Sequence, residues 1–117
     1  MPDNAVMLAG NATRDAELTF AGSGMAITSF GLAYNTRKQV NGEWEDGDPQ
    51  FFDVKVFGKM AENVAETIRK GMRVVVTGRL QQSSWEKDGE RKSKIEIVAD
   101  TVAPDLKWVT AEVTKSS

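Results

Sequence analysis

Residues 51–57 alternate between two kinds of side chain, and this alternation limits the possible folds more than any other stretch of the chain. Successive side chains of a β-strand point to opposite faces, so a strand here would have two unlike faces. One face would carry Phe51, Asp53, Lys55 and Phe57. The other would carry Phe52, Val54 and Val56 and would cover an apolar core. The pattern predicts a strand in a sheet with one buried and one open face.

The open face of this strand favours a flat, anionic ligand. Two phenylalanines and a lysine are costly to expose to water unless something covers them. Single-stranded nucleic acid fits such a surface, because its bases stack on aromatic rings and its phosphates attract lysines. The strand therefore indicates nucleic-acid binding.

The rest of the chain is predicted to form further strands and one helix. Met60, Val64 and Ile68 recur at every fourth residue and predict a helix over Met60–Arg69, with Gly71 as its C′ cap. The stretch 36–49 is expected to be a polar connection with a tight turn at Asn41-Gly42. Further strands are expected at residues 5–11, 17–20, 25–35, 73–80 and 94–102.

The order of these elements predicts an all-β fold. Apart from the short segment at 17–20, three strands precede the helix and two follow it, as in five-stranded Greek-key barrels of the oligonucleotide-binding (OB) class. Gly31, in the middle of a strand, is expected to mark a bend or bulge. We expect the barrel to occupy residues 1–104 and a C-terminal extension strand to lie within residues 105–117.

The charge distribution supports an anionic ligand despite a net charge of −2. Residues 69–94 contain eight basic and three acidic side chains, whereas the other residues contain seven basic and fourteen acidic ones. Binding follows the local potential, which extends about 8–10 Å in physiological salt. The alternative for Lys87–Lys94 is a solvated hairpin tip.

The chain lacks the residue types that several kinds of catalytic and metal site require. The chain has no cysteine and no histidine, which excludes disulfides, thiol nucleophiles, histidine bases and the usual zinc sites. The acidic residues between Glu43 and Asp48 could hold a hard cation weakly, but they match no calcium-loop pattern and are interpreted as a solvated tip. We therefore expect no enzyme activity, no cofactor and no metal. No membrane span or signal peptide is apparent, so a cytoplasmic location is expected.

Trp85 is the third aromatic residue with a predicted role in stacking. It lies in a polar segment that does not suit a core tryptophan. The alternative for Trp85, Phe51 and Phe57 is partial burial against lysine stems. Trp44 lies among acids that repel phosphate, so both stacking and a subunit contact remain open for it.

Basic residues near these aromatics are candidates for phosphate contacts. Lys55 is in register with the two phenylalanines, and Lys59 follows the same strand. Any single cation can instead be a solubilising surface group, but grouping around aromatic residues favours binding. The other candidates are Arg37, Lys38, Lys70, Arg73 and Arg79.

Six segments of the chain, in order and with matching spacing, resemble the bacterial single-stranded DNA-binding proteins. Gly42-Glu43-Trp44 and the segment from Ala103 to Trp108 are similar to the actinobacterial branch in particular. The six segments are Val6–Asn11, Arg14–Leu18, Phe30–Ala33, Val56–Val64, Arg69–Gly71 and Val74–Leu80.

The resemblance implies a homotetramer that coats single-stranded DNA without sequence preference in replication, recombination and repair, associated with the nucleoid. It implies base stacking on Phe51, Phe57 and Trp85, and phosphate contacts from Lys59 and Lys70. Leu106–Val113 would correspond to a strand or hook that ties subunits together.

The chain departs from this family at two places. Residues 81–84 and Asp53 stand where relatives often carry basic side chains, which should weaken binding and its salt dependence. The printed sequence ends at Ser117 without the family's flexible linker and acidic tip, so recruitment of repair and replication enzymes through a tail is not expected of these residues.

Two other functions remain possible from the residues. An OB-fold assembly subunit, resembling a primosome component, would bury Phe51 and Phe57 in a protein contact. An RNA chaperone would use the same stacking, but the aromatic residues here are dispersed over two strands rather than packed in one short cluster.

Overall fold

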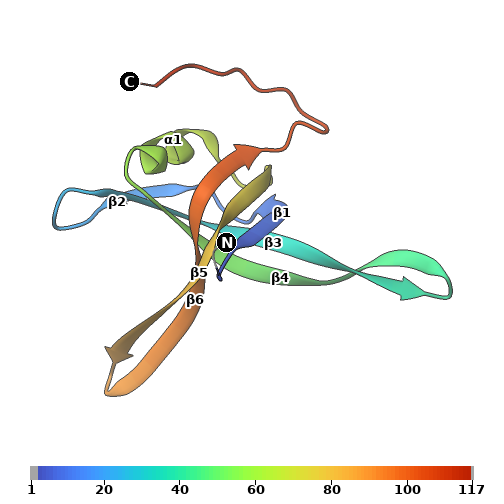
Figure 1. The fold of residues 1–117 in the computed structure, drawn as a ribbon, viewed down its shortest axis with the longest axis horizontal. Helices are drawn as coiled ribbons and strands as arrows, with labels where there is room; N and C mark the ends of the chain where they lie inside the picture. Colours follow the sequence, from blue (N-terminus) through green and yellow to red (C-terminus); the bar gives the residue numbers. More distant parts are fainter. Residues whose placement is uncertain (1–2, 117) are drawn as a thin grey trace.

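The structure is a computed structural model that describes residues 3–116. Figure 1 shows a body of strands and helix from which two twisted, two-stranded ribbons extend far outward. The strands are β1 (Val6–Ala12), β2 (Glu17–Phe20), β3 (Ala26–Val40), β4 (Glu43–Phe57), β5 (Arg73–Lys87) and β6 (Glu90–Pro104). The helix, α1 (Lys59–Thr67), lies between β4 and β5.

Five of the strands close into a barrel. The order across the sheet is β1-β5-β6-β4-β3-β2, and β1 pairs again with β3 through Asn11↔Ala33 and Ala12↔Leu32. This second pairing joins the two sides of the sheet, so the barrel strands are β1, β3, β4, β5 and β6. The short β2 pairs only with β3 and is the extra strand. The structure confirms the five-stranded OB barrel with its helix between the third and fourth barrel strands.

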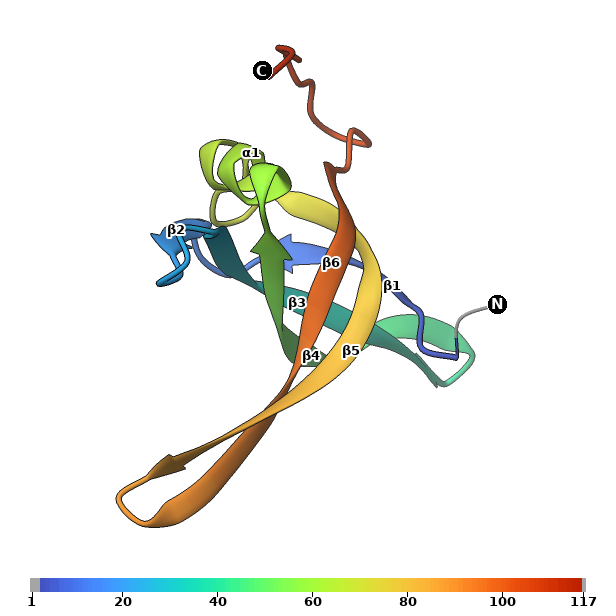
Figure 2. The same cartoon turned by 60° about the vertical axis from the view of Figure 1, so that its left-hand side comes forward.

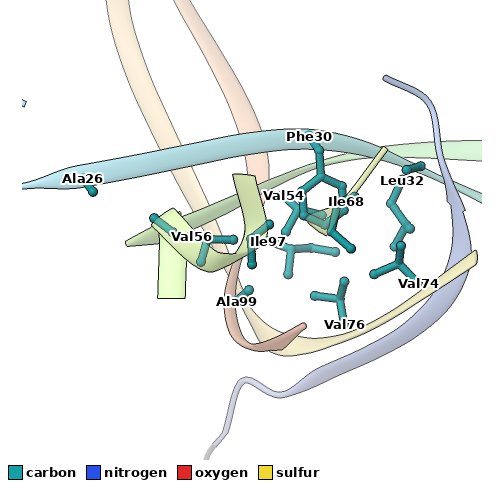
Figure 3. Close-up of a cluster of buried hydrophobic side chains, with 13 residues drawn as sticks. Ala26, Phe30, Leu32, Val54, Val56, Ile68, Val74, Val76, Ile97 and Ala99 are labelled. Carbon is teal, nitrogen blue, oxygen red and sulfur yellow. The ribbon is translucent and has the colours of Figure 1, made fainter. Parts of the chain in front are cut away.

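The core fills the barrel with side chains from alternate positions of each strand. Val54 and Val56 are fully buried, as the alternation in β4 predicts, and Phe30 and Leu32 meet them from β3. In Figure 3 these side chains converge with Ile68, which follows α1. The remaining strands contribute Val74, Val76, Ile97 and Ala99.

The helix is shorter than its apolar spacing predicts. It ends at Thr67, because Ile68 is extended (φ −85°, ψ 124°) and almost fully buried in the barrel. The Arg69 side chain then forms a hydrogen bond with the last turn of the helix, because its Nη1 donates to the carbonyl of Ala65 at 2.7 Å. Gly71 has a positive φ of 91°, but it belongs to the turn after the helix, so its prediction as the C′ cap was wrong. Within residues 3–116, the chain offers no helix with the length and apolar character that crossing a bilayer requires.

Both long hairpins project from the barrel as two-stranded arms, in different directions (Figures 1 and 2). The prediction of a polar connection over residues 36–49 was wrong, because β3 continues to Val40 and β4 begins at Glu43. Both faces of this arm are largely exposed, so its residues lack the apolar alternation that reveals a strand. The turns themselves are as expected, with positive φ at Asn41-Gly42 and at Asp88-Gly89.

Gly31 does not mark a bulge. The ladder passes regularly through Gly31↔Asp53, and the irregularity between β3 and β4 lies instead between Asn35 and Arg37. A Cβ at position 31 would overlap the hydroxyl of Thr13 and crowd the guanidinium of Arg14. Glycine is therefore needed for the close approach of these side chains to the outer surface of the barrel.

The C-terminal extension leaves the barrel after Pro104 and passes near α1 (Figure 1). Residues 105–116 form no strand within this chain, so the expected extension strand stays a prediction about pairing with another subunit. Arg73 holds the start of the extension, because its Nε donates to Oδ2 of Asp105 at 2.9 Å. Further along, the Nδ2 of Asn63 on α1 donates to the hydroxyl of Ser116 at 3.1 Å.

The anchor at Asp105 should be visible in a titration. The backbone N–H of Lys107 and the Arg73 guanidinium lower the pKa of the Asp105 carboxyl, because both bonds favour its charged form. A group with a lowered pKa contributes stability above its unfolded-state value, near 3.9, and loses that contribution as the pH falls through the folded-state value. An NMR titration of the carboxyl should give a pKa below the ordinary aspartate value. Arg73→Gln should raise it only partly, since the Lys107 bond remains; an ordinary pKa in the unaltered chain would contradict this anchor.

Candidate nucleic-acid interface

The outer face of β4 exposes the two phenylalanines that the alternation predicts. Phe51 is 69% and Phe57 is 40% exposed, whereas the valines between them are buried. Asp53 and Lys55 lie between the rings on the same face. The structure thus confirms that these four residues share an open surface.

The neighbouring strand β3 contributes only small side chains to this surface. In β3, the residues opposite Phe51, Asp53 and Lys55 are the small Ala33, Gly31 and Ser29. No large side chain of β3 therefore rises beside these three β4 positions. The side chains of Thr13 and Arg14 lie over Gly31, beside Asp53. The exposed ring of Phe51, opposite Ala33, is accessible to a planar group, as base stacking requires.

The same surface continues onto the arm formed by β5 and β6. β6 runs parallel to β4, with Glu96 beside Asp53, and Lys94 Nζ lies 3.6 Å from Oδ2 of Asp53. Side chains two residues apart share a face, so Lys92 and Lys94 point the same way. Trp85 is directly opposite Lys92 and 42% exposed. Stacking and charged groups therefore follow one surface from β4 to the tip of the arm.

Lys92 and Lys94 were not among the individual site residues predicted from the sequence, which left open whether Lys87–Lys94 belongs to a basic binding segment or is a solvated hairpin tip. A signal was available, because the two-residue turn at Asp88-Gly89 fixes the register of the hairpin. Counting outward from the turn pairs Lys87 with Glu90 and then Trp85 with Lys92. A shallow hollow of about 570 Å³ at this tip is lined by Trp85 and Lys92, together with Lys87, Asp88 and Glu90.

The predicted cationic residues differ in their partners. Within the part of the chain that the structure describes, Lys38 and Lys70 have no carboxylate within 4.0 Å. Where both partners are exposed, an ion pair contributes only about 0–1 kcal/mol, so a phosphate can compete for its cation. The carboxylate that pairs with Lys55, that of Glu96, is instead buried. The pairs are Arg37–Asp46 (3.8 Å), Lys55–Glu96 (3.4 Å), Lys59–Glu62 (3.7 Å), Arg73–Asp105 (2.9 Å) and Arg79–Asp100 (3.6 Å).

The structure brings only some of these cations to the aromatic surface. Lys55 lies on it, and Lys59 begins α1 just beyond Phe57. Lys70 and Arg73 lie at or just before the start of β5, whereas Trp85 is near its end. Arg79 is opposite Val98 of β6, which also pairs with Lys55, so Arg79 lies on the same face as Lys55. Arg37 and Lys38 lie on the β3–β4 arm, opposite Asp46 and Glu45.

Trp44 remains without an assigned role. It is 63% exposed near the end of the β3–β4 arm and pairs with Gln39 across the ladder. Of the acids around it, Asp46 lies 3.8 Å from Arg37. Among residues 3–116 no three acidic side chains come together in a way that could hold a metal ion.

Comparison with known proteins assigns the chain to a family. The model of the single-strand binding protein family matches residues 3–105. The chain belongs to this family. Among its relatives, the single-stranded DNA-binding protein of Mycobacterium leprae is 41% identical over 98% of this chain and 70% of its own length. That of Corynebacterium glutamicum is 44% identical over 97% of this chain and 52% of its own length.

A solved structure of a single-stranded DNA-binding protein has a similar fold. The crystal structure of the small single-stranded DNA-binding protein from Streptomyces coelicolor aligns with a TM-score of 0.75 at 26% identity. The alignment covers 91% of this chain and 97% of that one. These comparisons agree with the resemblance to actinobacterial proteins that the sequence motifs indicate.

Proposed function

We propose that this protein binds and protects single-stranded DNA without sequence specificity, during replication, recombination and repair. The observation that carries the proposal is the single open surface that presents Phe51, Phe57 and Trp85 along β4 and the β5–β6 arm. Membership of the single-strand binding protein family supports it, as do the relatives, which are named single-stranded DNA-binding proteins.

Stacking and charge together account for binding without readout of base identity. Every base has a flat face, so each ring accepts any base and contributes about 1–3 kcal/mol. Lysines and arginines along the strand path meet phosphates, which are the same for all sequences. The proposed contacts are those of Lys55, Lys59, Lys70, Arg37, Lys38, Arg73 and Arg79. The protein acts by occupying the strand, with no catalytic step, in the cytoplasm on nucleoid DNA.

Competition between nucleic acids tests this function. We expect a fluorescently labelled dT oligomer to bind tightly at low salt and to be displaced by unlabelled single-stranded DNA. A duplex of equal length should compete poorly, because its bases are stacked inside and cannot reach the rings. An RNA of equal length separates DNA coating from an RNA-chaperone function. Failure to bind dT at 20 mM salt, or equal competition by the duplex, would overturn the proposal.

We further propose that the chain assembles as a homotetramer, tied together by its C-terminal extension. The large apolar side chains of the extension, Leu106, Trp108, Val109 and Val113, are at least half exposed in the single chain. Such a series of apolar residues is typical of a segment that packs against another subunit. Sedimentation velocity should give a tetramer for the whole chain and a smaller species for residues 1–104. A monomer for the whole chain would exclude this assembly.

A further inference from the structure

Glu96 is a buried carboxylate in the middle of the aromatic surface. It is 4% exposed and lies on β6 beside Asp53 of β4. Lys55 Nζ lies 3.4 Å from its Oε1, and Lys94 Nζ lies 3.5 Å from its Oε2. The hydroxyl of Ser83 also donates to Oε1, at 3.2 Å. Each carboxylate oxygen is therefore paired with a lysine that the surface would otherwise offer to a ligand.

Asp53 extends this arrangement into a chain of alternating charges. Its Oδ2 lies 3.6 Å from the same Lys94 Nζ, and its Oδ1 lies 3.5 Å from Nη2 of Arg14. The chain runs from Arg14 through Asp53, Lys94 and Glu96 to Lys55. The three cations at the centre of the proposed binding surface are thus all paired with acids of the same surface.

Burial makes the pairs of Glu96 different from the other ion pairs on this surface. Removing the partners of a buried carboxylate leaves an uncompensated charge, which is strongly unfavourable. In the pair Arg79–Asp100 both side chains are exposed, at 52% and 65%, so separating them costs little free energy. A phosphate can therefore attract Arg79 readily, whereas it must compete with Glu96 for Lys55 and Lys94.

We propose that Glu96 sets the affinity of this surface for single-stranded DNA by withholding Lys55 and Lys94 from the phosphates. This inference rests on the proposed function. It means that Lys94 and Lys55, which is one of the proposed phosphate contacts, neutralise a protein carboxylate more than the DNA in the unaltered chain, although they lie between the stacking residues. The surface then holds DNA mainly by stacking, with a weak dependence on salt.

Glu96→Gln tests this proposal, because it removes the charge and keeps the shape and an acceptor for Ser83. The salt slope for a dT oligomer should steepen by about 0.7 for each lysine that gains a phosphate. At 50 mM salt this corresponds to roughly eight-fold tighter binding for one lysine and up to about sixty-fold for both. The matched control is Glu66→Gln on α1, which changes the net charge equally at an exposed site without an ion pair among the described residues.

Two further variants identify the lysines as the cause. In a Lys94→Gln background, the gain from Glu96→Gln should shrink, because one of the released lysines is absent. If circular dichroism shows that Glu96→Gln is unfolded, Lys94→Gln alone gives the answer: because Glu96 already withholds Lys94 from the DNA, this variant should leave the salt slope unchanged. A slope that becomes shallower by about 0.7 would show that Lys94 contacts a phosphate and would overturn the proposal.

The outcomes separate this inference from the proposed function. If the unaltered chain fails to bind dT, the proposed function is wrong. If it binds and Glu96→Gln matches Glu66→Gln in affinity and slope, or binds more weakly, Glu96 does not withhold the lysines. An equal gain with and without Lys94 would also overturn the proposal, since Glu96 would then act only as a general negative charge.

Discussion

Replacing Phe51 and Phe57 by alanine should weaken binding of a dT oligomer by about 1–3 kcal/mol for each ring, or roughly 5- to 150-fold. Both rings are exposed on the outer face of β4, so their loss removes stacking and leaves the core intact. Fluorescence anisotropy at constant salt measures the change. The salt slope should stay the same, because no phosphate contact is lost.

Phe20→Ala is the matched control for this pair. Phe20 is 64% exposed, close to the value for Phe51, but it pairs with Ala26, whose side chain is buried in the core. It therefore lies on the opposite side of the sheet from Phe57, and its removal should leave DNA affinity unchanged. Light scattering tests the alternative function: an OB-fold assembly subunit would lose its oligomeric state in the double variant and show no change in DNA binding.

Phe30→Ala should cause the largest loss of stability, about 3–5 kcal/mol in the free energy of unfolding. Phe30 is fully buried in the barrel, where Figure 3 shows it beside Ile68 and Val54. The substitution leaves a cavity in the core of the barrel. For a domain of this size, such a loss is a large part of the total stability.

Urea denaturation followed by circular dichroism measures this effect. Phe20→Ala again serves as the control, since truncating an exposed ring should change the free energy of unfolding by less than about 1 kcal/mol. A loss below about 1 kcal/mol for Phe30→Ala would contradict the position of this ring at the centre of the core.

Much of the fold could be predicted from the apolar period of the sequence. In residues 51–57 the alternation identified both the buried valines and the exposed phenylalanines. It failed for residues 36–49, because a ribbon that is exposed on both faces needs no apolar alternation to form its ladder. The end of α1 was misjudged because Ile68 fits the helical period but is buried by the barrel in an extended conformation.

The candidate site could be predicted in part. Phe51 and Phe57 followed from a single strand, and the pairing of Trp85 with Lys92 could have been counted from the Asp88-Gly89 turn. The contact between Lys55 and Glu96 could not, because the two residues are 41 positions apart and meet only through the parallel pairing of β4 with β6. Local patterns show which side chains share a strand face, whereas the charge available to a ligand depends on contacts across the sheet.

The most direct test uses a variant in which Trp85 is the only tryptophan, made by Trp44→Phe and Trp108→Phe. Its fluorescence would be titrated with a dT oligomer at low and high salt, while anisotropy of the labelled oligomer reports binding independently. We predict strong quenching that saturates with binding, at an affinity that falls as salt rises, because a base stacks on Trp85 while phosphates meet cations. Binding without any change in Trp85 emission, or no binding at low salt, would contradict the proposed interface.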